Sequence, residues 1–186
     1  MPKLLFLAGS ARKESYNKKL AKAASEKAAS LGADVTLIDL ADYPMPIFCE
    51  DLEAEQGLPD SAKALKKLFE AHDGFLISSP EYNSSFSPLL KNSLDWISRP
   101  ENADEPRLMA FNSKVAALVA ATPGALGGIR GLVPLRLWLS NIGVHIIPTQ
   151  FCLAQAHQAF DGNGALLSNN PLFDATIAEF VKTAGK

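Results

Sequence analysis

Short apolar runs alternate with longer amphipathic stretches along this chain. Five of the runs have the length of a buried strand, and they occupy residues 3–8, 35–40, 74–79, 115–121 and 144–148. Apolar residues at helical spacing predict helices up to Leu31 and over 60–72, 87–97, the stretch that follows residues 122–128, and 171–184. Strands that alternate with helices predict an α/β fold, with a parallel sheet covered by helices on both faces.

Two stretches show neither period. Residues 41–59 contain several prolines, and residues 99–112 are polar and charged except around 108–111, so both are expected to be loops. Pro134 interrupts the fourth predicted helix. Because proline is tolerated in the first turn of a helix, we expect that helix to begin just before it.

The segment from Gly9 to Asn17 joins the first predicted strand to the first predicted helix. Such a turn directs free backbone N–H groups and the positive end of the helix dipole at one point, where a phosphate binds well. The spacing matches neither a Walker loop nor the three-glycine dinucleotide fingerprint, which favours a phosphate monoester. The alternative is an ordinary capped turn, since Ser and Asn are common N-caps.

Two further segments leave the third and fourth predicted strands. One is Pro80-Glu81-Tyr82-Asn83 and the other runs from Thr122 to Gly128. In an open parallel sheet, loops at the carboxyl ends of the strands converge on a cleft where the strand order reverses. The first of these loops can also be a simple Pro-led turn with a solvated Glu81, and glycine clusters often mark turns only.

These three blocks, with 90–96 (Leu-Lys-Asn-Ser-Leu-Asp-Trp) after the second and 129–130 (Ile-Arg) after the third, resemble the NADPH-dependent FMN reductase family. That family is flavodoxin-like and includes chromate- and quinone-reducing members. The resemblance implies one domain over residues 1–186, with a doubly wound sheet of five parallel strands in the order 2-1-3-4-5 and three α/β/α layers.

The resemblance also implies a role for each block. The FMN phosphate is expected on Ser10, Arg12, Ser15 and Asn17. The isoalloxazine ring is expected against Pro80, Glu81, Tyr82 and Asn83. The other side of the ring is expected near Thr122, Gly124, Gly127 and Gly128. No side chain is expected to act as a catalytic acid or base, because the flavin itself carries the chemistry.

The implied activity is hydride transfer from NADPH, or NADH, to bound FMN and on to a second acceptor. One cleft that serves both substrates in turn predicts ping-pong kinetics with a flavin, quinone, azo compound or metal oxyanion as acceptor. Two alternatives remain, a flavodoxin-like electron carrier and a flavin-binding regulatory protein. The net charge of −2 disfavours a carrier, which usually has a more acidic surface, and the intact phosphate segment disfavours a protein that has lost the flavin.

Composition narrows the other functions. A net charge of −2 disfavours nucleic-acid binding, and no apolar run reaches membrane-spanning length or forms a signal peptide, so we expect a cytoplasmic protein. The two cysteines lie far apart, and the three histidines show no ligand spacing, so we expect neither a disulfide nor a metal.

The third and fourth predicted helices carry more Leu and Trp than a single sheet-facing stripe needs. We therefore expect part of these helices, including Leu94 and Trp96, to lie between subunits of a homodimer or homotetramer. Burial of all these side chains in the core is the alternative.

Overall fold

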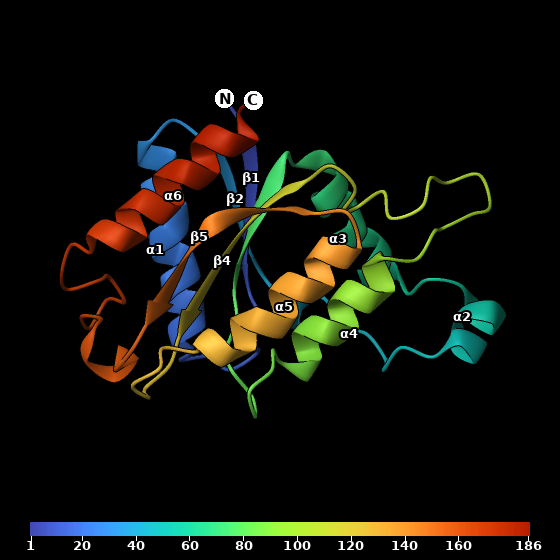
Figure 1. Ribbon diagram of the computed structural model, residues 1–186. Helices are drawn as coiled ribbons and strands as arrows, with labels where there is room; N and C mark the ends of the chain where they lie inside the picture. The colour runs from blue at the N-terminus through green and yellow to red at the C-terminus, as the bar shows by residue number, and fades with distance from the viewer.

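A computed structural model describes all 186 residues as a five-stranded sheet between two layers of helices (Figure 1). The strands are β1 (Lys3–Ala8), β2 (Asp34–Asp39), β3 (Gly74–Ser78), β4 (Val115–Ala121) and β5 (His145–Leu153). The helices are α1 (Tyr16–Ser30), α2 (Glu50–Gln56), α3 (Asp60–Ala71), α4 (Pro88–Ile97), α5 (Ile129–Asn141) and α6 (Pro171–Ala184), with 3-10 turns at Leu40–Asp42 and Ala156–Gln158. All neighbouring strands are parallel in the order β2-β1-β3-β4-β5, which confirms the flavodoxin-like α/β fold.

The two faces of the sheet bury separate cores. In β1, Leu5 and Leu7 pack with α3, α4 and α5, whereas Leu4 and Phe6 pack with α1 and α6. Because both faces are covered, the inner strands read as continuous apolar runs and not as alternating ones. Strand order reverses between β1 and β3, so their carboxyl ends define the switch point at which a ligand is expected.

β5 extends five residues beyond the predicted end at Pro148. Between its pairs Ala116↔Ile146 and Leu118↔Gln150 the register shifts, and Pro148 lies inside this bulge. β5 is an edge strand, and an edge strand tolerates a residue without an N–H group. The apolar run that predicted the strand ends at Pro148, so the sequence pattern did not show the residues beyond it.

The predicted position of Pro134 was wrong. α5 begins at Ile129, directly after Gly128 at φ 91°, so Pro134 lies well inside the helix. The ring of a proline removes the hydrogen bond to the residue four positions earlier, here Arg130. The helix continues nonetheless because Leu132, Leu135 and Leu139 are completely buried, and tertiary packing outweighs local propensity.

The segment 41–59 is not entirely a loop, because it contains α2. No residue of α2 is buried, so the sequence carries no apolar period there to indicate a helix. Its first turn does contain Glu50, Asp51 and Glu53, which suit the positive end of the helix dipole. These acidic residues are a sequence signal for the start of α2, which the apolar pattern does not show.

The placement of Leu94 and Trp96 between subunits was also wrong. Leu94 is 1% exposed and Trp96 is completely buried. Phe48 stacks edge-on to the Trp96 ring at 5.0 Å, and the Trp96 indole N–H donates to the carbonyl of Pro46 at 2.8 Å. Residues of the 41–59 segment therefore cover Trp96, which was expected to contact a second subunit.

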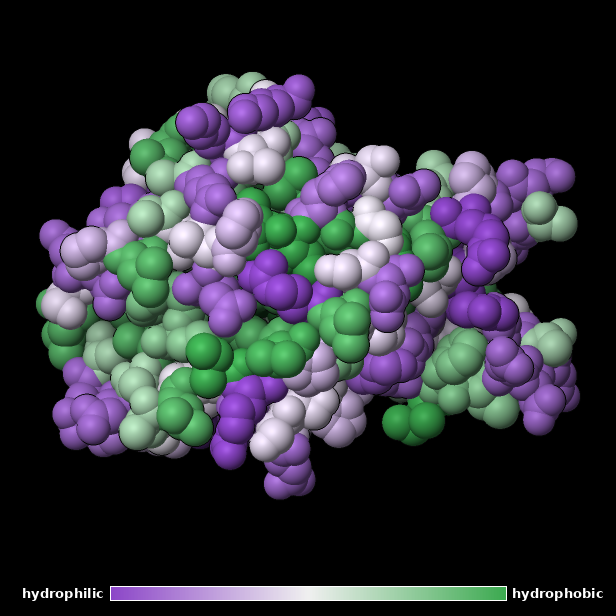
Figure 2. Space-filling view, viewed as in Figure 1, coloured by the Kyte–Doolittle hydropathy of each residue, from purple (hydrophilic) through white to green (hydrophobic).

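The exposed apolar side chains of this region lie on α5 instead. Val133 and Leu137 are each 65% exposed and Ile129 is 42% exposed, at intervals of one helical turn. Figure 2 shows hydrophobic side chains gathered over the position of α5. We refer to Ile129, Val133 and Leu137 as the α5 stripe.

Candidate functional site

The three predicted loops meet in one cleft of about 390 Å³ at the carboxyl ends of β1, β3 and β4. This volume lies within the range of small-molecule sites. The predicted residues that line it are Ser10, Arg12, Ser15, Asn17, Pro80, Glu81, Tyr82 and Thr122. The predicted residues Asn83, Gly124, Gly127 and Gly128 are not part of its lining. Tyr16, Ala121 and Pro123 line the cleft without having been predicted.

The start of α1 is open toward a ligand. Ser15 occupies the N-cap position with extended backbone, but its hydroxyl makes no capping hydrogen bond. The backbone N–H groups of Tyr16, Asn17 and Lys18 find no acceptor within the protein. Buried helix starts normally satisfy such groups by a cap, by water or by a ligand. This end of α1 therefore presents donors and positive potential to the cleft.

Asn17 has a structural role at the same place. Its side-chain N–H donates to the carbonyl of Ala121 at 2.9 Å, and its Oδ1 accepts from the Ala121 N–H at 2.9 Å and from the Ser78 hydroxyl at 3.0 Å. The amide is 3% exposed and joins α1 to the ends of β3 and β4. Asn17 thus fixes the helix start against the sheet, and its contact with phosphate stays a prediction.

The second loop forms a tight turn. Tyr82 and Ser85 exchange two backbone hydrogen bonds, at 2.8 and 3.1 Å, around Asn83 at φ 51° and Ser84 at φ 66°. Two successive left-handed residues make a turn of the type I′ class, which Asn tolerates better than most residues. Asn83 is at the exposed tip of this turn, which explains why it does not line the cleft.

Two glycines of the third loop are required by packing. Gly127 and Gly128 have φ of 62° and 91°, and a Cβ there would lie 2.9 Å from the Cys152 backbone and 2.8 Å from the Ala120 Cβ respectively. Gly124 is different, because a Cβ at that position would meet only the Thr122 hydroxyl at 3.8 Å. Gly127 and Gly128 therefore let β4, β5 and α5 approach one another closely.

The charged groups of the cleft are few. Among the lining residues, Arg12 is the only cationic side chain and Glu81 is the only acid. The Arg12 guanidinium lies 5.4 Å from the centre of the Tyr16 ring, a distance suited to a cation–π contact. Behind the loops, burial raises the pKa of the Cys152 thiol and the negative charge of Glu81 raises it further, so this thiol stays neutral near pH 7.

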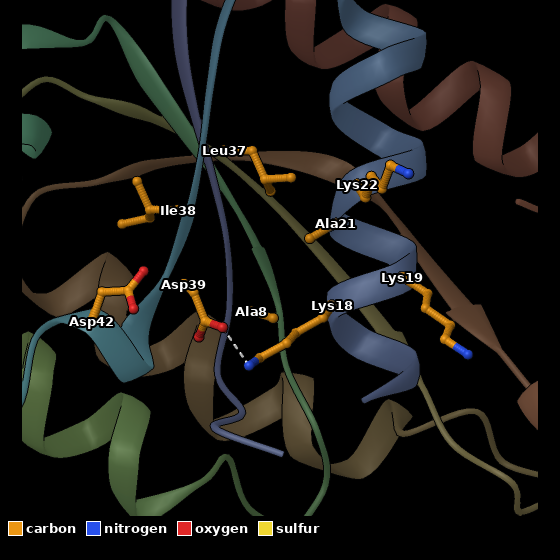
Figure 3. A pocket seen from close by; sticks show the side chains of 9 residues that line it. All are labelled: Ala8, Lys18, Lys19, Ala21, Lys22, Leu37, Ile38, Asp39 and Asp42. Atoms are coloured by element: carbon orange, nitrogen blue, oxygen red, sulfur yellow. Dashed lines mark hydrogen bonds and ion pairs between the residues drawn. The ribbon is translucent and has the colours of Figure 1, made fainter. Parts of the chain in front are cut away.

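A second cavity, of about 420 Å³, lies between α1 and β2 (Figure 3). Its floor is apolar, and at its rim the Lys18 ammonium pairs with the Asp39 carboxylate at 2.5 Å. None of the predicted site residues lines it. Elsewhere, no group of three or more His, Cys, Asp or Glu side chains has the arrangement of a metal site, and none of the helices has the length and apolarity to span a membrane.

A sheet of this order is that of a flavodoxin-like α/β protein, and the open start of α1 lies at its switch point. The family model described as NADPH-dependent FMN reductase matches residues 2–158, and the chain belongs to that family. It is therefore an oxidoreductase that works with FMN and NAD(P)H.

Individual relatives agree. The chain is 35% identical to an NAD(P)H-dependent FMN reductase of Pseudomonas aeruginosa, over 90% of this chain and 85% of that protein. It is 38% identical to an NAD(P)H:quinone oxidoreductase of Solanum tuberosum, over 88% and 82% of the two chains. Among solved structures, the flavoenzyme NAD(P)H:(acceptor) oxidoreductase of Paracoccus denitrificans superposes with a TM-score of 0.83 at 26% identity, over 100% of this chain and 98% of the other.

Proposed function

We propose that the cleft holds FMN and that the enzyme reduces a quinone with NAD(P)H by a ping-pong mechanism. The observation that carries this proposal is the open start of α1, where three backbone N–H groups lack an acceptor within the protein. A phosphate monoester supplies the acceptors that these groups lack. Riboflavin, which has no phosphate, does not.

The remaining residues position the rest of the cofactor. We place the phosphate at α1 beside Ser10, Ser15 and Arg12, and the flavin ring between the Tyr82–Ser85 turn and the loop that begins at Thr122. When bound, FMN supplies the redox chemistry by taking a hydride from the nicotinamide and passing it on. The protein holds both partners at reacting distance with fixed backbone, and no side chain is assigned the role of a catalytic acid or base.

The relatives support a quinone as the acceptor. Besides the plant protein, a quinone reductase of Pseudomonas putida is 38% identical over 92% of this chain and 89% of its own length. Tyr82, which is 51% exposed at the cleft, offers an aromatic surface to a flat acceptor ring. A single cleft of about 390 Å³ favours alternate occupancy by NADPH and quinone, which is the basis of the ping-pong proposal.

The test is an absorbance titration of the apoprotein with FMN and with riboflavin, followed by anaerobic NADPH. We expect FMN to bind at least tenfold more tightly than riboflavin because of its charge-assisted phosphate contacts. NADPH then bleaches the bound flavin and a benzoquinone restores its colour. Equal affinities for FMN and riboflavin would contradict the proposed phosphate site. Bound FMN that NADPH fails to bleach would favour an electron carrier.

We further propose that the α5 stripe packs against a second copy of the chain in a homodimer. Replacing Val133 or Leu137 by Glu is expected to give monomers in light scattering. Leu172→Glu, at a 50% exposed leucine on α6, is the matched control and is expected to leave the assembly unchanged. A wild-type protein that is monomeric at micromolar concentration would refute this proposal.

A further inference from the structure

One ion pair connects the two loops on either side of the cleft. Arg130 at the start of α5 donates from Nε to Glu81 Oε1 at 2.7 Å, and its Nη2 lies 2.6 Å from the same oxygen. The Glu81 side chain is 8% exposed, whereas that of Arg130 is 59% exposed. The Glu81 carboxylate is thus enclosed, and the Arg130 guanidinium covers it from the solvent side.

The backbone around this pair is packed just as closely. A Cβ on Gly131 would lie 3.1 Å from the carbonyl oxygen of Ser85 and 3.3 Å from Glu81 Cα. The first turn of α5 therefore lies directly against the loop that contains the Tyr82–Ser85 turn. Its own two hydrogen bonds, the ion pair and the close packing against Gly131 together hold this loop in place.

The pair also decides the charge at the cleft. Glu81 is the only acid among the lining residues. NADPH brings negative charge to the cleft, and FMN gains negative charge there when it is reduced. An unpaired carboxylate there would oppose both. A cation in contact with it cancels this effect at short range.

We propose that Glu81 and Arg130 are a positioning pair, in which Arg130 neutralises the one carboxylate of the cleft and Glu81 fixes the flavin loop to α5. This inference rests on the proposed placement of FMN. It goes beyond that placement by predicting that the two residues affect reduced FMN in opposite directions. A pair that only holds the loop would affect it in one direction.

The test compares the dissociation constants of oxidised and reduced FMN, measured anaerobically, in four variants. Arg130→Gln is expected to weaken the binding of reduced FMN by roughly tenfold relative to that of oxidised FMN, because it leaves the Glu81 carboxylate unpaired. Glu81→Gln is expected to shift the same ratio the other way. The double variant is expected to return the ratio of the two dissociation constants to the wild-type value. Arg130→Lys keeps the positive charge and is expected to leave the ratio close to that of the wild type. NADPH is expected to show a raised KM in Arg130→Gln.

Arg107→Gln is the matched control, since it removes an exposed arginine that lies outside the cleft lining. A ratio that moves in the same direction in both single variants, or that does not move, overturns the inference while FMN binding and bleaching still uphold the proposed function. Wild-type protein that fails to bind FMN overturns the proposed function first. Arg130 is mostly exposed, so its two variants decide the question even where Glu81→Gln lowers the melting temperature of the apoprotein.

Discussion

The cleft and the outer segments of the molecule use similar residues in opposite ways. We define the outer segments as residues 43–59, which include α2, and residues 99–113; they project beyond α3 and α4 on the right of Figure 1. There, Lys66 of α3 donates to the carbonyl of Arg99 at 2.7 Å and pairs with Glu105, and the Arg99 guanidinium binds Glu53 at 2.8 Å. In the cleft, Arg12 and the first N–H groups of α1 have no such partner.

The difference lies in where polar groups find partners. In the outer segments the polar groups named above are satisfied inside the protein, so they hold loops in place. In the cleft, several donors are left for a ligand, and the one acid is neutralised. Unsatisfied donors beside a cavity therefore separate the binding site from a structural network more clearly than charge alone.

Breaking the Lys66–Glu105 pair is expected to have the largest effect. The two side chains are 1% and 11% exposed, so Glu105→Gln leaves a buried ammonium without its counter-charge. We expect a loss of about 3–5 kcal/mol in the free energy of unfolding, measured by urea denaturation. Lys66→Met with Glu105→Leu is the control and should recover most of this loss. A change below 1 kcal/mol in Glu105→Gln would contradict the assignment.

The pH dependence of that loss has a definite sign. Burial raises the pKa of Glu105, but the hydrogen bonds from Lys66 and from the Glu101 N–H, together with the Lys66 charge, hold it below its ordinary value. A depressed folded-state pKa stabilises the protein above the unfolded value of about 4.3, and this contribution is lost as the pH falls further. The stability gap between wild type and Glu105→Gln should therefore narrow below about pH 4.

Arg12→Ala tests the cleft side of the comparison. Because Arg12 is exposed and its guanidinium contacts only the Tyr16 ring, at 5.4 Å, its removal should change the melting temperature little. FMN binding should weaken by about 1.5–3 kcal/mol, the value of a charged hydrogen bond. Fluorescence titration measures this, and riboflavin binding should barely change. An equal loss for both ligands would place Arg12 away from the phosphate.

The two cysteines report on the two regions. Cys49 is exposed in an outer segment, whereas Cys152 lies behind the cleft with its pKa raised by burial and by Glu81. We expect iodoacetamide to alkylate Cys152 at least tenfold more slowly than Cys49 at pH 8, because Cys152 is less accessible and its raised pKa leaves little of it as thiolate. The Cys152 rate should rise only at a pH above the range of an ordinary thiol. Glu81→Gln should move the Cys152 profile toward lower pH, and an unchanged profile would show that Glu81 does not act on it.

The smallest effect is expected at an exposed pair on α1. Lys22 and Glu26 are 55% and 63% exposed and 3.7 Å apart. Glu26→Gln should cost about 0.5 kcal/mol or less in unfolding experiments, because solvent screens such pairs. A loss close to that of Glu105→Gln would mean that burial does not explain the contrast.

Much of the fold was predictable because its signals are local. Alternating apolar runs predicted the five strands, and three loops at their ends predicted the cleft. The burial of Trp96 was not predictable, since its cover comes from residues such as Phe48 that are distant in sequence and carry no period. The partner of Glu81 was missed for the same reason, because 49 positions separate it from Arg130 and only folding brings them together.

The bulge in β5 has a consequence for how copies of the protein can meet. β5 forms one margin of the sheet, and along it Pro148 offers no N–H group while the shifted register bends the backbone. A regular strand from another molecule cannot dock along such a margin, because its hydrogen bonds would be interrupted midway. Growth into a continuous intermolecular sheet through β5 is therefore disfavoured.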